Sequence, residues 1–153
     1  MVERLEYEKA IMLIEPCYLS FESALYDLNI KSRGTYRYQA ACLSNSYLLN
    51  LGKINVEFIK IPKDYFFGFV WKNGVAWAEP EKALLDYIYR CEMLGIKPDL
   101  YDVDWLSLNK RKLESYAEEM QIEIPFPDLK SLKKSTHPKD KFLSEELEIF
   151  LNR

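Results

Sequence analysis

The stretch around residues 80–95 constrains the fold most, because it carries the start signal, the apolar face and the stop signal of one long helix. Pro80 suits the first helical position, and Glu81 favours the positive end of the helix dipole. Gly95 suits the left-handed residue that closes a helix. The sequence therefore predicts a helix over 80–94 with one broad face directed to a core. The apolar residues of that face are Ala83, Leu84, Tyr87, Ile88 and Cys91.

A second amphipathic helix is predicted over 20–28. Ser20 is a good N-cap residue, and Glu22 stands in the first turn, where the helix dipole favours a carboxylate. Its apolar residues follow the i, i+3, i+4, i+7 spacing of a single face. Further helices are predicted at 3–14, where Pro16 follows, at 109–121, and, as a short acidic helix, at 144–151.

Strand patterns fill the region between the helices at 20–28 and 80–94. They are predicted at 35–43, 54–61, 65–72 and 75–78. Asn73-Gly74 is a signal for a two-residue hairpin turn between the last two. The alternation slips at Phe58–Ile59, which indicates either a bulge or a strand buried on both sides.

These elements predict an α/β (α+β) fold, in which a small antiparallel sheet packs against several helices. The helices at 20–28 and 80–94 are expected to cover one face of that sheet, because both carry broad apolar stripes. The length of 153 residues fits one domain, 1–153.

Composition narrows the classes of function. A net charge of −3 argues against a domain that binds nucleic acid non-specifically, although a local basic face remains compatible with it. The three cysteines form no CxxC pair, which argues against a zinc site and favours reduced, buried thiols. The charged N-terminus lacks the apolar core of a signal peptide, and no apolar run reaches membrane-spanning length, so a cytoplasmic protein is expected.

The sequence offers little for catalysis. The single histidine, His137, lies in a polar, lysine-rich stretch, and no phosphate-binding or nucleophile-elbow motif occurs. Asp86 follows two leucines in the helix at 80–94, so a buried, hydrogen-bonded role is favoured over a catalytic one. Asp99, Asp102 and Asp104 are interpreted as a solvated turn, because the glycine and terminal glutamate of a calcium loop are missing. We expect no enzyme activity, no cofactor and no metal.

Two basic segments have open interpretations. Lys31, Arg33 and Arg37, interleaved with Tyr36 and Tyr38, are candidates for nucleic-acid contact, or equally a surface loop that enters a strand. The lysines of the second segment are accompanied by Asp128 and Asp140, which favours a solvated, mobile stretch. They are Lys130, Lys133, Lys134, Lys139 and Lys141.

Three stretches together resemble a known family. They are YLSFESALY at 18–26, FFGF at 66–69 and AEPEKALLDYIY at 78–89. Their order and spacing resemble the C-terminal domain of AbiEi-type antitoxins of type IV toxin–antitoxin (abortive infection) systems, over about residues 15–125. The resemblance therefore implies a domain core over 15–125 and a tail over 126–153. The family-motif residues, read as structural or partner-binding, are Ser20, Glu22, Ser23, Gly68, Pro80, Glu81, Lys82 and Asp86.

The resemblance implies a partner and a function. The partner is an AbiEii-like nucleotidyltransferase toxin, which the antitoxin neutralises in a viral defence system. Family members also repress their own promoter through an N-terminal winged helix-turn-helix, for which the 17 residues before Tyr18 are too few. The alternative function is a transcriptional regulator or nucleic-acid-binding component of such a system.

Two side-chain roles are left as hypotheses. Lys82 is expected to pair with Glu22 or Asp86 across packed helices. Glu118 and Glu119 are candidates for a toxin-facing acidic surface, with a solvated helix face as the alternative.

Overall fold

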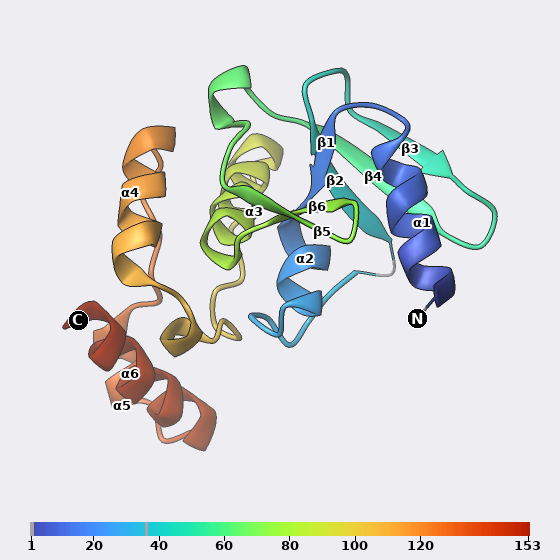
Figure 1. The fold of residues 1–153 in the computed structure, drawn as a ribbon. Coiled ribbons are helices and arrows are strands. Elements are labelled where there is room, and N and C mark those ends of the chain that lie inside the picture. The colour runs from blue at the N-terminus through green and yellow to red at the C-terminus, as the bar shows by residue number, and fades with distance from the viewer. Residues whose placement is uncertain (1, 36) are drawn as a thin grey trace.

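The computed structural model describes residues 2–35 and 37–153 and contains one mixed sheet with helices on both of its faces (Figure 1). The helices are α1 (Val2–Met12), α2 (Phe21–Asp27), α3 (Pro80–Leu94), α4 (Lys110–Met120), α5 (Leu129–Lys134) and α6 (Pro138–Leu151). The strands are β1 (Cys17–Leu19), β2 (Tyr38–Cys42), β3 (Tyr47–Asn50), β4 (Asn55–Lys60), β5 (Phe69–Lys72) and β6 (Val75–Ala78). This confirms an α/β fold in which a sheet packs against helices.

The sheet is mixed, which corrects the expectation of a purely antiparallel one. The strand order is β3-β4-β2-β1-β6-β5. β1 runs parallel to β6, with Leu19 opposite Trp77, and β2 runs parallel to β4. β1 and β3 were not predicted, and the expectation of antiparallel pairing rested on strands that follow one another in the sequence. Because β1 lies between β2 and β6, strands that follow one another in the sequence are not all neighbours in the sheet.

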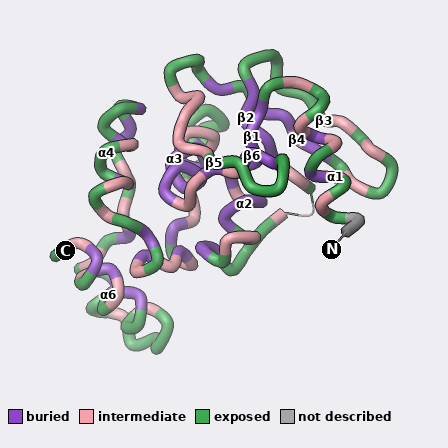
Figure 2. The backbone as a smooth tube through the Cα atoms, in the orientation of Figure 1, coloured by how far each residue is buried: buried purple, intermediate pink, exposed green. Residues whose placement is uncertain are grey.

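The two sheet faces carry separate hydrophobic clusters. Tyr18 and Ala41 point to the face covered by α2 and α3, as predicted, and belong to the larger cluster. Their neighbours Cys17 and Ala40 point to the other face, where Ile11 of α1 joins a smaller cluster. Figure 2 shows the buried backbone concentrated in this layered region.

The slip in the alternation of β4 is a strand buried on both sides. Phe58 belongs to the cluster under α1, and Ile59 belongs to the cluster under α2 and α3. The pairing with β2 runs through both residues without interruption, with Ala40 opposite Phe58 and Ala41 opposite Ile59. The slip therefore reflects two apolar environments and not a bulge.

Local sequence signals correctly predicted the bounds of α3 and the turn between β5 and β6. α3 begins at Pro80, and Gly95 closes it with φ 68° in the left-handed region. Asn73 and Gly74 have φ 53° and 80° and join β5 to β6, as a two-residue hairpin turn requires.

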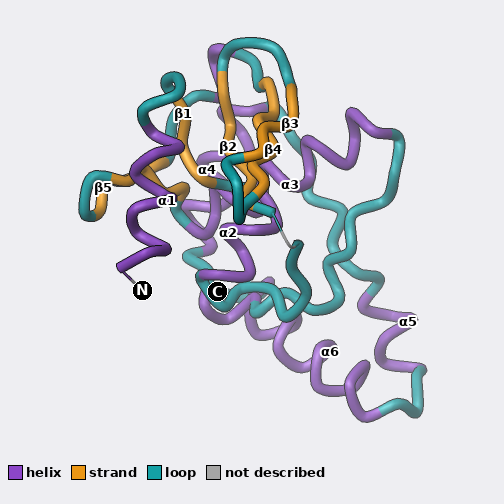
Figure 3. Tube along the Cα trace, turned by 90° about the vertical axis from the view of Figure 1, so that its right-hand side faces the viewer, coloured by secondary structure: helices purple, strands orange, loops and turns teal. Residues whose placement is uncertain are grey.

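The C-terminal part packs into the main core. α5 and α6 lie side by side (Figure 3), and Leu132, Leu143 and Phe150 belong to the larger hydrophobic cluster. The ring of Phe150 lies 5.5 Å from that of Trp105, which is fully buried. Residues 126–153 thus continue the core that was expected to end near residue 125. No helix among residues 2–35 and 37–153 is long and apolar enough to cross a membrane.

Candidate functional site

The separated family-motif stretches meet at one buried polar cluster, formed by Tyr18, Ser20, Lys82 and Asp86. Tyr18 and Ser20 donate hydrogen bonds to Oδ2 of Asp86, at 2.8 and 2.7 Å. The ammonium of Lys82 donates to Oδ1 of Asp86 at 2.5 Å. Since Tyr18 and Ser20 flank the end of β1 and the other two residues lie on α3, the cluster ties the central sheet to the longest helix.

Lys82 is fully buried, yet its ammonium is well surrounded. Besides Asp86, it donates to the hydroxyl of Tyr18 at 2.8 Å and lies 4.9 Å from the centre of the Phe67 ring. A carboxylate, a hydroxyl and an aromatic face together replace water around the charge. Of the two partners expected for Lys82, the structure selects Asp86, four residues along the same helix, and not Glu22.

Burial opposes charge on both members of the pair. It lowers the pKa of the Lys82 ammonium, an effect that Asp86 counteracts through its charge and hydrogen bond. Burial also raises the pKa of the Asp86 carboxyl, against the bonds from Lys82, Ser20 and Tyr18. All four members are buried, which confirms the hydrogen-bonded interior role expected for Asp86.

Gly68 makes room for the lysine stem. Its φ of 75° lies in the left-handed region, and a Cβ built there would lie 2.8 Å from Cγ of Lys82. The glycine of the FFGF stretch and the lysine of the AEPEKALLDYIY stretch therefore meet in space. Tyr18 was missed as a site residue, although its spacing of two from Ser20 gave a signal, since residues two apart in a strand share a face.

Ser20 does not cap α2 with its side chain, which corrects that expectation. Its hydroxyl is bound to Asp86, and the first turn of α2 is satisfied by β2 instead. The amide of Ser23 donates to Oε1 of Gln39 at 3.1 Å, and the amide of Gln39 donates to Oγ of Ser23 at 2.9 Å. Gln39 carried no sequence signal for this contact.

Glu81 is also buried, and it joins α3 to α4. Its carboxylate accepts a hydrogen bond from the backbone amide of Asn109 at 2.8 Å. The preceding Glu79 accepts from Lys112 and Tyr116, both at 2.6 Å. The start of α3, marked in the sequence by Pro80, is therefore an anchor for the next helix.

The basic segment at 31–38 does not form a continuous cationic surface. The side chain of Lys31 is 1% exposed, pairs with Asp102 and donates to the backbone oxygen of Asp99 at 2.6 Å. This corrects both the surface position expected of Lys31 and the fully solvated turn expected around Asp102. Arg33 and Arg37 are exposed, and Tyr36 lies outside the described residues.

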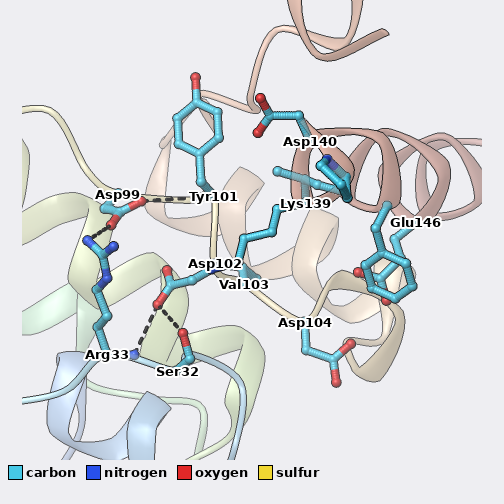
Figure 4. Close-up of a pocket in the computed structure, with 13 residues that line it drawn as sticks. Ser32, Arg33, Asp99, Tyr101, Asp102, Val103, Asp104, Lys139, Asp140 and Glu146 are labelled. Carbon is cyan, nitrogen blue, oxygen red and sulfur yellow. Dashed lines mark hydrogen bonds and ion pairs between the residues drawn. The ribbon is translucent and has the colours of Figure 1, made fainter. Parts of the chain in front are cut away.

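A cavity of about 870 Å³ lies between this loop region and α6 (Figure 4). Asp99 and Asp102 line it, but both are engaged by protein donors. Asp102 accepts from the hydroxyl of Ser32 and the amide of Arg33, and Asp99 lies 3.5 Å from the Arg33 guanidinium. These carboxylates hold the 99–102 loop against the segment that follows α2.

A smaller groove, of about 470 Å³, lies between α4 and α6 and is called the acid-rimmed groove below. Glu118 lines it, whereas the neighbouring Glu119 does not, although both are exposed. Of the two candidate toxin-facing residues, only Glu118 therefore belongs to this groove.

The described residues contain no group of three or more histidine, cysteine, aspartate or glutamate side chains placed to hold a metal ion. Cys17, Cys42 and Cys91 are buried free thiols, and burial raises the pKa of each.

Comparisons with protein-family models, with curated proteins and with solved structures found no match to this chain.

Proposed function

We propose that this chain is a cytoplasmic protein-binding domain of the AbiEi antitoxin type, which neutralises an AbiEii-like nucleotidyltransferase toxin. One observation carries the proposal: Ser20, Gly68, Lys82 and Asp86, drawn from three separated motif stretches, converge at the buried polar cluster. These motif residues contact one another in the interior of the protein. This supports the interpretation that the sequence resemblance reflects a shared fold. Recognition of the partner then belongs to the outer surface.

Co-expression tests this function directly. The test uses the nucleotidyltransferase-like toxin that the proposal expects in the adjacent gene. This toxin is induced alone and together with the chain, and growth is followed. We expect the toxin alone to arrest growth and the chain to restore it. Continued arrest, with the chain present in the soluble fraction at a level matching the toxin, would contradict the proposal.

Nucleic-acid binding is a second candidate function, supported by the exposed Arg33, whose side chain is 80% exposed. With Lys31 buried, only Arg33 and Arg37 of the three candidate cations are available to phosphates. A promoter fragment at about 150 mM salt is therefore expected to show only non-specific binding. A tight, sequence-specific complex that Arg33→Glu/Arg37→Glu abolishes would establish this second function instead.

A further inference from the structure

The acid-rimmed groove has an apolar floor built from α4, α6 and the segment between α4 and α5. Its volume of about 470 Å³ falls in the range of about 300–1,000 Å³ that is typical of ligand pockets. The apolar lining residues are Leu113, Ala117, Ile122, Ile124, Phe126, Phe150 and Leu151. Such a floor favours large apolar side chains over a purely polar ligand.

The rim of the groove is acidic. Glu114, Glu118 and Glu123 line it, against a single cation, Lys110. The Lys110 ammonium is already used, because it donates to the backbone oxygen of Leu151 at 2.7 Å and lies 3.7 Å from Glu114. Glu118 and Glu123 are exposed, and their carboxylates form no hydrogen bond or ion pair within residues 2–35 and 37–153.

We propose that the acid-rimmed groove receives a basic amphipathic segment of the partner protein. Apolar side chains on one face of that segment fill the floor, and lysine or arginine side chains beside them meet Glu118 and Glu123. This is helix-in-groove recognition, in which the floor supplies affinity and the rim selects the charge of the partner. The identity of the partner as the toxin rests on the proposed function, whereas the chemistry of the groove does not.

The first experiment uses a defined probe. A labelled helical peptide of about 14 residues, made of leucine on one face and lysine on the other, is titrated into the full chain. Its counterpart, with glutamate in place of lysine, is the matched ligand control. We expect the lysine peptide to bind at least about tenfold more tightly and to shift the methyl resonances of Ile122 and Ile124.

A pair of charge-reversed variants locates the contact. Glu118→Lys/Glu123→Lys should weaken binding of the lysine peptide by about tenfold or more. Glu119→Lys/Glu145→Lys is the matched control, because it changes the net charge by the same amount at exposed residues that do not line the groove. It should change the affinity for the lysine peptide by less than about twofold. Equal losses in both variants, or equal affinity for both peptides, would overturn the proposal. The proposal would also be overturned if the chain self-associated in a concentration-dependent way and Glu118→Lys/Glu123→Lys abolished that self-association. The occupant of the groove would then be a second copy of this chain.

Growth rescue separates this inference from the proposed function. If the chain rescues toxin-arrested cells and Glu118→Lys/Glu123→Lys does not, both proposals gain support. If that variant rescues as well as the unaltered chain, the groove is not the toxin contact and the antitoxin function stands. If the unaltered chain fails to rescue, the antitoxin function is wrong, and the peptide titration still decides the chemistry of the groove.

Discussion

Lys82 and Asp86 lie one turn apart on α3, and both are fully shielded from water. Removal of one member of such a pair leaves an uncompensated buried charge, whereas replacement of both by apolar residues is often close to neutral. We expect Lys82→Met and Asp86→Leu each to lower the free energy of unfolding by about 3 kcal/mol. The double variant should lose clearly less than the sum.

A double-mutant cycle in urea measures this coupling. Strictly additive losses, or an unchanged stability in Lys82→Met, would show that the two charges do not depend on each other. Tyr18→Phe keeps the ring but removes both the hydrogen bond donated to Asp86 and the one accepted from Lys82. It should cost about 2 kcal/mol and serves as a smaller perturbation of the same cluster.

Gly68 combines a left-handed backbone with a close neighbour, and the two effects can be measured separately. Gly52 has a similar φ of 85° but no atom within 4 Å of a built Cβ. Gly52→Ala should therefore cost about 1 kcal/mol, from the backbone conformation alone. Gly68→Ala should cost about 1–3 kcal/mol more, because the new methyl group meets the stem of the buried Lys82. Equal losses in urea unfolding would show that the lysine stem adapts without strain.

At the scale of elements, the start of α2 depends on β2 through Ser23 and Gln39. Gln39→Met keeps the length of the side chain but removes both the acceptor for Ser23 and the hydrogen bond that Gln39 donates to Glu57. We therefore expect a loss of about 1–2 kcal/mol. Amide hydrogen exchange should accelerate at Ser23 and remain unchanged at Lys112, whose amide is capped independently by Asn109. An unaltered exchange rate at Ser23 would contradict this role of Gln39.

The bridge between Lys31 and Asp102 ties the segment after α2 to the 99–104 loop, and its contribution depends on pH. Burial alone would raise the pKa of Asp102, but the bonds from Lys31, Ser32 and the Arg33 amide lower it overall. The unfolded chain therefore binds a proton at this carboxyl more readily than the folded protein. The stabilisation is fully present above the unfolded pKa of about 4 and is lost as pH falls through the lower folded value.

Asp102→Asn tests this dependence. The variant should be less stable than the unaltered chain by about 2 kcal/mol at pH 7, because a charge-assisted contact to a buried lysine is weakened. The difference should shrink as urea unfolding is repeated at progressively lower pH below about pH 4. A difference that stays constant down to the acid limit would show that the charge of Asp102 contributes nothing.

Elements with local signals were predictable from the sequence, and contacts between distant segments were not. Pro80 and Gly95 gave the limits of α3, and Asn73-Gly74 gave the hairpin. The three-residue strand β1 is too short for a periodic pattern, and its parallel pairing with β6 depends on how the whole sheet is assembled. The candidate site shows the same difference between local signals and distant contacts. The burial of Asp86 was predicted from its apolar neighbours in the sequence. The burial of Lys31 could not be predicted, because it depends on a contact with Asp102, which is distant in the sequence.

At the scale of the whole molecule, the C-terminal helices and the sheet share one hydrophobic core. Phe150 is fully buried, and its ring contacts those of Trp105 and Phe126. Phe150→Ala should therefore lower the free energy of unfolding by about 3–5 kcal/mol. Tryptophan fluorescence and far-ultraviolet circular dichroism should still report a single, coincident transition. Two separated transitions, with the loss confined to one of them, would show that α5 and α6 unfold independently.

The central position of β1 also governs the order of events during synthesis. The partner of Cys17–Leu19 on one edge, β2, is complete once residue 42 has emerged, whereas the partner on the other edge, at Trp77 of β6, is made later. At roughly 5–20 residues per second, that edge stays open for a few seconds on each translating ribosome. Its unpaired backbone groups are then free to pair with another nascent strand, so yield in the cell should respond to translation speed between β2 and β6.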